Sequence, residues 1–246
     1  MKNRILIALL VAFSACNTQL QVKDKQIHNT RIKSDSIGGE DARSKALIAP
    51  YKLKLDSLMN IRIMVASADI KKEQPEGALG NMVCDLLMRN VIKNGHKPDF
   101  CVLNNGGLRI PTIYAGNVYI RTVYELMPFD NQLVMLKLKG SKCAELLELI
   151  AQNNGVPVSG LRLVIQNNQA TAIQVQGAAF DLNKDYWILT SDYLANGGDK
   201  ADALKNPIET INLNQKIRDV LIAQMKEMYY EGETLQSIKD GRITKN

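Results

Sequence analysis

The stretch Asn104-Asn105-Gly106-Gly107-Leu108-Arg109 follows a segment, Asp99 to Asn104, whose apolar residues predict a short strand. Two adjacent glycines let a backbone approach a ligand closely, and exposed amides in such a loop can meet an anion. Arg109 adds a planar guanidinium that suits phosphate or sugar oxygens. The alternative is a tight turn after the strand that carries a surface arginine. The stretch alone leaves both interpretations open.

A second glycine loop, Asp192-Tyr193-Leu194-Ala195-Asn196-Gly197-Gly198-Asp199, follows a predicted strand at Trp187 to Thr190. It places carboxylates and an aromatic ring beside two glycines, and ligands commonly bind to loops at strand ends. The alternative is again a turn. Phe129 follows Pro128 in a polar stretch, so its ring is either a core side chain or an exposed surface on which a base can stack.

Periodicity and turn residues outline the rest of the chain. Pro50 should kink or split the first helix. Thr122 and Glu125 have the spacing of a capping box for a short helix that Pro128 ends. Helices are expected at 42–59, 78–94, 144–151 and 215–229, and strands at 61–65, 99–104, 118–120, 133–138, 161–165, 172–175 and 187–190. These elements mix without a regular βαβ repeat, which predicts an α+β fold with mixed sheets and packed helices.

Composition excludes several classes of protein. The chain has 246 residues, of which 46% are apolar and 23% charged, so it is neither disordered nor fibrous. The net charge is +6, without a long basic run or a basic stripe interleaved with aromatics, and we expect no nucleic-acid partner. The two histidines, His28 and His96, cannot build a histidine-rich metal centre.

The first residues have the pattern of an export signal. Lys2 and Arg4 precede the apolar run Ile5 to Phe13, and two small residues follow. We expect a signal peptide at 1–15, lipidation at Cys16, and a flexible tether at 16–41, which anchor the protein in a membrane outside the cytoplasm. The alternative is an ordinary signal peptide cleaved near by. The other cysteines, Cys84, Cys101 and Cys143, are expected to be buried thiols with one possible pair.

Four segments in this order resemble the C-terminal domain of the family of 5′-nucleotidases, UDP-sugar hydrolases and 2′,3′-cyclic phosphodiesterases. They are Ala78-Leu-Gly-Asn-Met-Val-Cys-Asp85, Asn104-Asn-Gly-Gly-Leu-Arg109, Tyr124-Glu-Leu-Met-Pro-Phe-Asp-Asn131 and Ser191-Asp-Tyr-Leu-Ala-Asn-Gly-Gly-Asp199. The similarity covers essentially all of the expected folded part, residues 42–246.

The resemblance implies a nucleotide-binding domain and a role for each matching residue. Phe129 and Tyr193 fall on the two rings that hold the base, and Asp199 on the acid that takes a ribose hydroxyl. Asn104 and Arg109 fall on ligand-binding positions, and Gly106 and Gly107 lie between them. No catalytic or metal-ligating residue is expected in this chain.

The sequence departs from the family in two places. The stretch Glu73-Gln74-Pro75-Glu76 lacks the arginine that the family usually carries on its phosphate side, although Lys71 and Lys72 are near. The Asp-x-His and Gly-Asn-His motifs of the metallophosphoesterase domain have no counterpart. We therefore expect half of a hydrolase, inactive alone, with the divalent metals on a separate metallophosphoesterase partner and no cofactor bound here. The alternatives are a nucleoside- or nucleotide-binding module without hydrolysis and a scaffold with a decayed site.

Overall fold

The computed structural model describes Lys25 and residues 41–246. The predicted signal peptide, Cys16, His28 and nearly all of the tether lie outside these residues. The chain divides at Pro50, and the unit Tyr51–Asn246 holds every element described below except the first half of α2. Among the described residues, no helix combines the length and apolar character needed to cross a bilayer.

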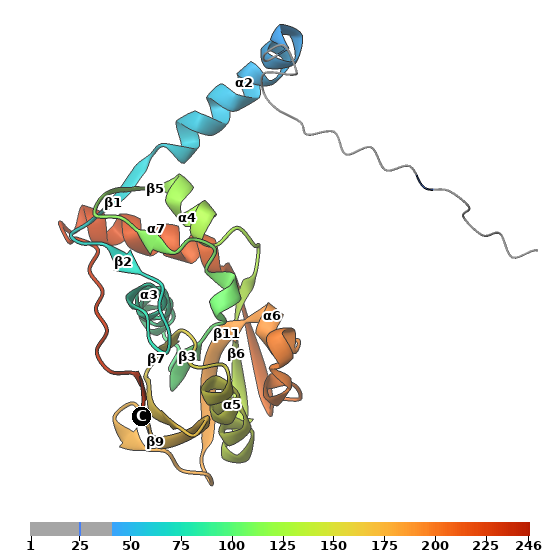
Figure 1. The fold of residues 1–246 in the computed structure, drawn as a ribbon, viewed down its shortest axis with the longest axis vertical. Helices are drawn as coiled ribbons and strands as arrows, with labels where there is room; N and C mark the ends of the chain where they lie inside the picture. The colour runs from blue at the N-terminus through green and yellow to red at the C-terminus, as the bar shows by residue number, and fades with distance from the viewer. Residues whose placement is uncertain (1–24, 26–40) are drawn as a thin grey trace, which may run out of the picture. The chain divides into compact units, whose positions relative to one another are not determined.

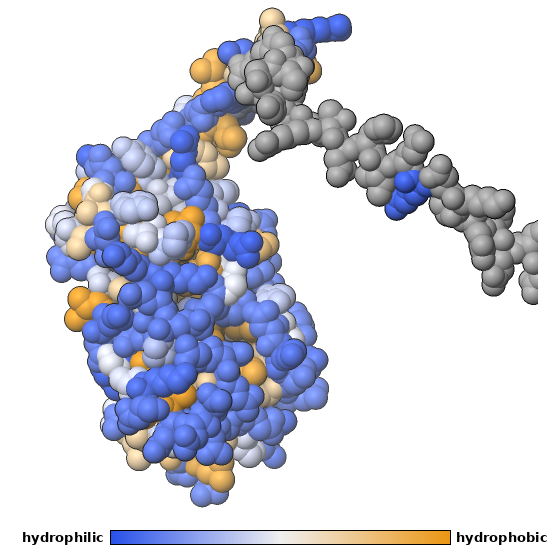
Figure 2. Space-filling view, viewed as in Figure 1, coloured by the Kyte–Doolittle hydropathy of each residue, from blue (hydrophilic) through white to orange (hydrophobic). Residues whose placement is uncertain are grey.

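Helix α2 (Ala42–Met59) confirms the first predicted helix but not its split, because it continues through Pro50. Proline removes one backbone donor, and this helix tolerates the loss without ending. None of its residues is buried, and Figure 2 shows apolar side chains exposed along it.

A five-stranded sheet forms the centre of the second unit. Its order is β12 (Glu209–Lys216), β6 (Gln132–Lys139), β11 (Asp185–Ser191), β3 (Phe100–Val102) and β7 (Val158–Ser159). Strand β11 runs antiparallel to β6 and parallel to β3, so the sheet is mixed, as predicted. The edge strand β12 was not predicted, because the polar sequence Glu209-Thr-Ile-Asn-Leu-Asn-Gln-Lys216 carries only a weak alternation.

The sheet separates two apolar cores because successive side chains of a strand point to opposite faces. On β6, Leu133 and Met135 belong to one core, and Val134, Leu136 and Leu138 belong to the other. Both faces of the sheet are therefore covered, which explains why β6 is apolar almost throughout.

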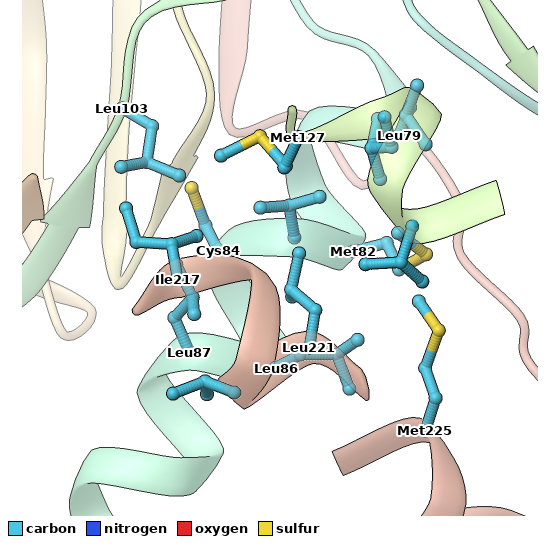
Figure 3. Packing of buried hydrophobic residues seen from close by; sticks show 14 of the residues in the cluster. Leu79, Met82, Cys84, Leu86, Leu87, Leu103, Met127, Ile217, Leu221 and Met225 are labelled. Carbon is cyan, nitrogen blue, oxygen red and sulfur yellow. The ribbon is translucent and has the colours of Figure 1, made fainter. Parts of the chain in front are cut away.

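Helices α3 (Ala78–Lys93) and α7 (Ile217–Tyr230) cover one face of the sheet, and α5 (Gly140–Gln152) covers the other (Figure 1). Figure 3 shows Leu87 and Cys84 of α3 packing near Ile217 and Leu221 of α7. Asn94 caps the end of α3, and Gly95 follows with φ +86°, the left-handed position expected there.

The second core extends beneath a four-stranded sheet. Its order is β10 (Ala178–Ala179), β9 (Gln169–Val175), β8 (Leu161–Gln166) and β13 (Ile243–Lys245). Strands β8 and β9 form the predicted hairpin, turned by Asn167 and Asn168 with φ of +51° and +60°. Strand β13 adds in parallel to β8, so the end of the chain is part of the fold.

Two small antiparallel pairs complete the unit: β1 (Arg62–Ala66) with β5 (Gly116–Tyr119), and β2 (Ile70–Lys71) with β4 (Thr112–Ile113). Helix α4 (Ile120–Leu126) follows β5 and corrects the predicted capping box. Its N-cap is Tyr119 rather than Thr122, whose hydroxyl instead accepts from the Tyr119 backbone N–H at 3.3 Å. The helix starts earlier because the extended Tyr119 ends β5 directly before it.

The three cysteines of the described region, Cys84, Cys101 and Cys143, are buried free thiols. Burial raises the pKa of Cys143 to about 12, so this thiol stays protonated and unreactive at neutral pH.

Candidate functional site

The two glycine loops lie at the same edge of the central sheet. Strands β3 and β11 are parallel neighbours, with Leu189 opposite Cys101, so their carboxyl ends point the same way. The first loop leaves β3 and forms the 3₁₀ turn η2 (Asn105–Gly107). The second leaves β11 as the one-turn helix α6 (Asp192–Ala195) and the turn η3 (Gly198–Lys200). Ligands of such sheets commonly bind outside the carboxyl ends of the strands.

Asp199 joins the two loops through both carboxylate oxygens. The Tyr193 hydroxyl donates to Oδ1 at 2.8 Å, and the Asn104 amide donates from Nδ2 to Oδ2 at 2.6 Å. The hydrogen bond to Asp199 raises the pKa of the Tyr193 phenol, which stays neutral in the physiological range. Asp199 takes φ +51°, an uncommon backbone conformation for a residue other than glycine.

Close packing around these side chains favours glycine at two positions. A Cβ on Gly198 would lie 2.4 Å from Cε1 of Tyr193, so the ring rests directly on the glycine backbone. A Cβ on Gly107 would lie 3.0 Å from Oδ1 of Asn104. The glycines therefore let the Tyr193 ring and the Asn104 amide lie close over the two loops.

Phe129 lies between α4 and β6, and half of its surface is exposed to solvent (50%). The Arg109 guanidinium carbon is 5.8 Å from the centre of its ring, and Nη1 of Arg109 donates to the Gly106 carbonyl at 3.3 Å. The interpretation of Phe129 as a core side chain is therefore wrong.

Phe129 and Tyr193 line one pocket of about 270 Å³ together with all the other predicted binding residues. Its lining residues are Asn104, Gly106, Gly107, Arg109, Phe129, Asn131, Tyr193 and Asp199. We call this cavity the two-ring pocket. Of these lining residues only Asn131 was not predicted, although it ends the same polar stretch, Pro128-Phe129-Asp130-Asn131, that contains Phe129.

Arg218 on α7 holds the segment that carries Phe129. Its side chain is 8% exposed, and Nη1 donates to the Pro128 carbonyl at 3.0 Å while Nη2 donates to the Asp130 carboxylate. Its guanidinium carbon lies 4.2 Å from the centre of the Tyr124 ring. The residues on both sides of Phe129 are thus fixed to one buried cation. No local signal in the sequence marks Arg218, which is almost ninety residues away.

Asp192 connects the Phe129 side of the pocket to the Tyr193 side. Its Oδ1 accepts from the backbone N–H of Gln132 at 3.1 Å and of Tyr193 at 2.8 Å. Gln132 begins β6 three residues after Phe129. This carboxylate therefore sets the spacing of the two segments that supply the rings.

The stretch that lacks the family's arginine does not reach the two-ring pocket. Glu76 is buried, and its carboxylate accepts from the Asn81 amide at 2.7 Å and from the backbone N–H groups of Asp240 and Gly241 at 2.9 and 3.0 Å. It holds the segment that leads into β13. Lys72 comes closer to the pocket, since its ammonium donates to the carbonyl of Leu108, beside Arg109, at 2.9 Å.

The site offers rings and hydrogen-bonding groups rather than metal ligands. Within residues 41–246, no group of three or more His, Cys, Asp or Glu side chains is placed to hold a metal ion. A neutral aromatic ligand with hydroxyl groups matches the two half-exposed rings, the Asn104 amide and the Asp199 carboxylate.

Comparisons with known proteins point to one family. The sequence model of the 5′-nucleotidase C-terminal domain matches residues 58–206. The UshA protein of Yersinia enterocolitica is 32% identical over 181 residues, which are 70% of this chain and 32% of that protein. A snake venom 5′-nucleotidase from Macrovipera lebetinus is 25% identical over 193 residues, 68% of this chain and 46% of its own.

The fold matches as well. A 5′-nucleotidase precursor from Thermus thermophilus superposes with a TM-score of 0.72 and 26% identity, over 84% of this chain and 44% of that one. The chain therefore spans 32% to 46% of the length of these relatives.

Proposed function

Because the chain belongs to the family of 5′-nucleotidase C-terminal domains, we propose that it recognises the nucleoside part of a nucleotide for a phosphoester hydrolase. The observation that carries the proposal is the two-ring pocket, which gathers Asn104, Arg109, Phe129, Tyr193 and Asp199 from three separate segments. The base stacks on the rings of Phe129 and Tyr193. Asp199 accepts a ribose hydroxyl, and Asn104 and Arg109 contact polar atoms of the ligand. We take the domain to span residues 42–246, since β13 pairs within the fold.

The hydrolytic step is assigned to a separate metallophosphoesterase polypeptide, which supplies the divalent metals and the attacking water. Support comes from the lining of the two-ring pocket, which offers aromatic rings and hydrogen-bonding groups to a ligand. The relatives that this chain matches are two to three times its aligned length, and in this proposal their remaining part corresponds to the partner. In this proposal the chain itself binds no metal or cofactor.

The place of action is proposed to be outside the cytoplasm, at a membrane. Lys2 and Arg4, the apolar run Ile5 to Phe13, and Cys16 have the order of a lipoprotein signal. A relative from venom, a secreted fluid, is compatible with an exported protein. Cys16 carries the lipid anchor in this proposal.

Calorimetric titration of the full chain with adenosine, AMP and a UDP-sugar tests the binding role. Each stacked ring is worth roughly 1–3 kcal/mol, so Phe129→Ala is expected to weaken adenosine binding by about 5- to 150-fold. Tyr230→Ala is the matched control, because this tyrosine is 87% exposed and lines none of the pockets described here. Equal affinities for the wild type and Phe129→Ala would overturn the base-stacking role.

Phosphate release from AMP, measured with Mg²⁺, Mn²⁺ or Zn²⁺, tests the division of labour. The chain alone is expected to release none, and release is expected after a metallophosphoesterase partner is added. Hydrolysis by this chain alone, abolished by Arg109→Ala, would show that the chemistry resides here.

A binding module that acts without hydrolysis is the second candidate. It is favoured by the Glu73–Glu76 stretch, which carries no arginine to bind a phosphate and whose Glu76 carboxylate holds the C-terminal segment. This candidate predicts that adenosine binds at least as tightly as AMP. The half-enzyme predicts a preference for the phosphorylated ligand.

A further inference from the structure

A second and larger pocket lies on the other side of the two glycine loops. Its volume is about 400 Å³, within the range of small-molecule sites. It shares Asn104, Gly106 and Asp199 with the two-ring pocket, so the Asn104–Asp199 hydrogen bond borders both. We call this cavity the α5 pocket, because α5 supplies one of its walls. The rings of Phe129 and Tyr193 do not line the α5 pocket.

The α5 pocket is apolar where it meets the core. Leu146 and Ile150 of α5 are buried, while Leu149 and Val156 are only half-buried and leave apolar surface open toward solvent. Val102, Leu103, Leu194, Ala201 and Leu204 complete the apolar lining. Binding of an apolar ligand in such a cavity is favourable, because apolar surface of both the ligand and the lining is removed from water.

Several polar groups at the rim are held by hydrogen bonds within the protein. The Gln74 amide donates to the carbonyls of Asn153 and Gly155 at 2.9 Å each, and the Asn105 amide donates to the Gly155 carbonyl at 2.9 Å. The Asp199 carboxylate accepts from Tyr193 and Asn104. The rim is therefore ordered before any ligand arrives, which lowers the cost of binding.

Lys200 is the one cation among the residues that line the α5 pocket, and it is exposed. Its ammonium has no hydrogen-bond or ion-pair partner among the residues that the structure describes. Its neighbour Asp199 is also in the lining, but both oxygens of that carboxylate already accept hydrogen bonds. The neutral donors do not cancel the negative charge of Asp199, so the lining holds one anion and one cation, and Lys200 is the cation left to pair with an anionic ligand.

We propose that the α5 pocket is a second binding site, for a small carboxylic acid with an apolar ring-sized body, whose carboxylate pairs with Lys200. The body lies against Leu146, Leu149 and Ile150. The two pockets share Asn104, Gly106 and Asp199, but this proposal does not depend on nucleoside recognition.

Phenylacetate, 2-phenylethanol and phenethylammonium test the proposal as a matched series, since they share the ring and differ in the charge at the end. Calorimetry on the full chain is expected to give a dissociation constant of about a millimolar for phenylacetate. 2-Phenylethanol should bind about fivefold more weakly, the most that an exposed ion pair supports, and phenethylammonium more weakly still. Lys200→Gln should reduce phenylacetate to the affinity of the alcohol and leave the alcohol unchanged.

Two tryptophan variants locate the site. Leu149→Trp fills the cavity from its half-buried wall and should reduce phenylacetate binding at least tenfold. Ser141→Trp adds the same ring at an exposed position of α5 that does not line the pocket, and should leave binding unchanged. Thermal unfolding of each variant verifies that it is folded.

Three results would overturn the proposal: no binding of phenylacetate, equal binding by Leu149→Trp and the wild type, or a preference for phenethylammonium. Loss of phenylacetate binding in Phe129→Ala would also overturn it, since the acid would then occupy the two-ring pocket. Failure of adenosine to bind while phenylacetate binds would refute the nucleoside proposal alone.

Discussion

Replacing Arg218 by methionine should both destabilise the protein and loosen the ring of Phe129, to which we assign base stacking. Methionine keeps most of the buried apolar volume of the arginine stem but removes every donor. The Pro128 carbonyl and the Asp130 carboxylate then lose the cation that fixes them on either side of Phe129.

The magnitude follows from the burial of the partners. A charge-assisted hydrogen bond to a carbonyl contributes about 1.5–3 kcal/mol, and the Pro128 bond is the only such contact at an ideal distance, 3.0 Å. Asp130 is 61% exposed, so its ion pair adds no more than about 1 kcal/mol. Removing the buried charge recovers part of its desolvation cost. A net loss of about 2 kcal/mol is expected, or about 4–8 °C in Tm for a unit of this size.

Urea denaturation and thermal unfolding measure this loss, and adenosine calorimetry measures the loosening of Phe129. Affinity should fall about fivefold, the cost of re-ordering one side chain and its segment. Arg218→Lys keeps the charge without the planar fork that reaches both acceptors, and should give an intermediate result.

Lys216→Met is the matched control, because Lys216 contacts the same Asp130 carboxylate at 2.7 Å but is 41% exposed. It should cost less than about 1 kcal/mol and leave adenosine affinity unchanged. If Lys216→Met lowers the free energy of unfolding and the adenosine affinity as much as Arg218→Met does, the buried contact to Pro128 is not what fixes the segment around Phe129. That result would refute the reasoning.

Three further predictions concern other parts of the chain. Gly198→Ala should displace the Tyr193 ring, since a Cβ would lie 2.4 Å from it, and reduce adenosine affinity about tenfold with near-native circular dichroism. Hydrogen bonds from Lys216 and Arg218 lower the pKa of Asp130 below 3.8, so its contribution to stability is complete above that value and is lost as the pH falls below it. Asp130→Asn should therefore lessen the acid dependence of unfolding below about pH 4, and an unchanged dependence would count against it. Cys16→Ser should move the protein, expressed in a bacterium that lipidates exported proteins, from the detergent phase to the aqueous phase of a Triton X-114 extraction; retention in detergent would argue against the anchor.

The sequence alone was sufficient to predict the helices and strands with a strong local pattern. The helix at Ala78–Lys93, the strand around Leu133–Leu138 and the hairpin turned at Asn167 and Asn168 were all predicted, because apolar periodicity and turn chemistry are local properties. The candidate residues of the two-ring pocket were also predicted, since they lie within three of the four short segments that resemble a known family.

Tertiary structure decided what depends on distant partners. The polar strand β12 forms because β6 offers it an open edge, and β13 forms because β8 does. Helix α4 begins at Ile120 rather than after Thr122, because β5 ends at Tyr119. Pro50 does not split α2.

The same division holds for the site. Short motifs in the sequence determined which residues could contact a ligand. Only the fold decided that they meet, because the parallel pairing of β3 with β11 brings both glycine loops to one edge and lets Asp199 bond to Asn104 across 95 residues. The support of Phe129 by Arg218 and the apolar α5 pocket behind the loops depend on side chains from separate elements. Such contacts have no periodicity along the chain, since they arise from packing in three dimensions.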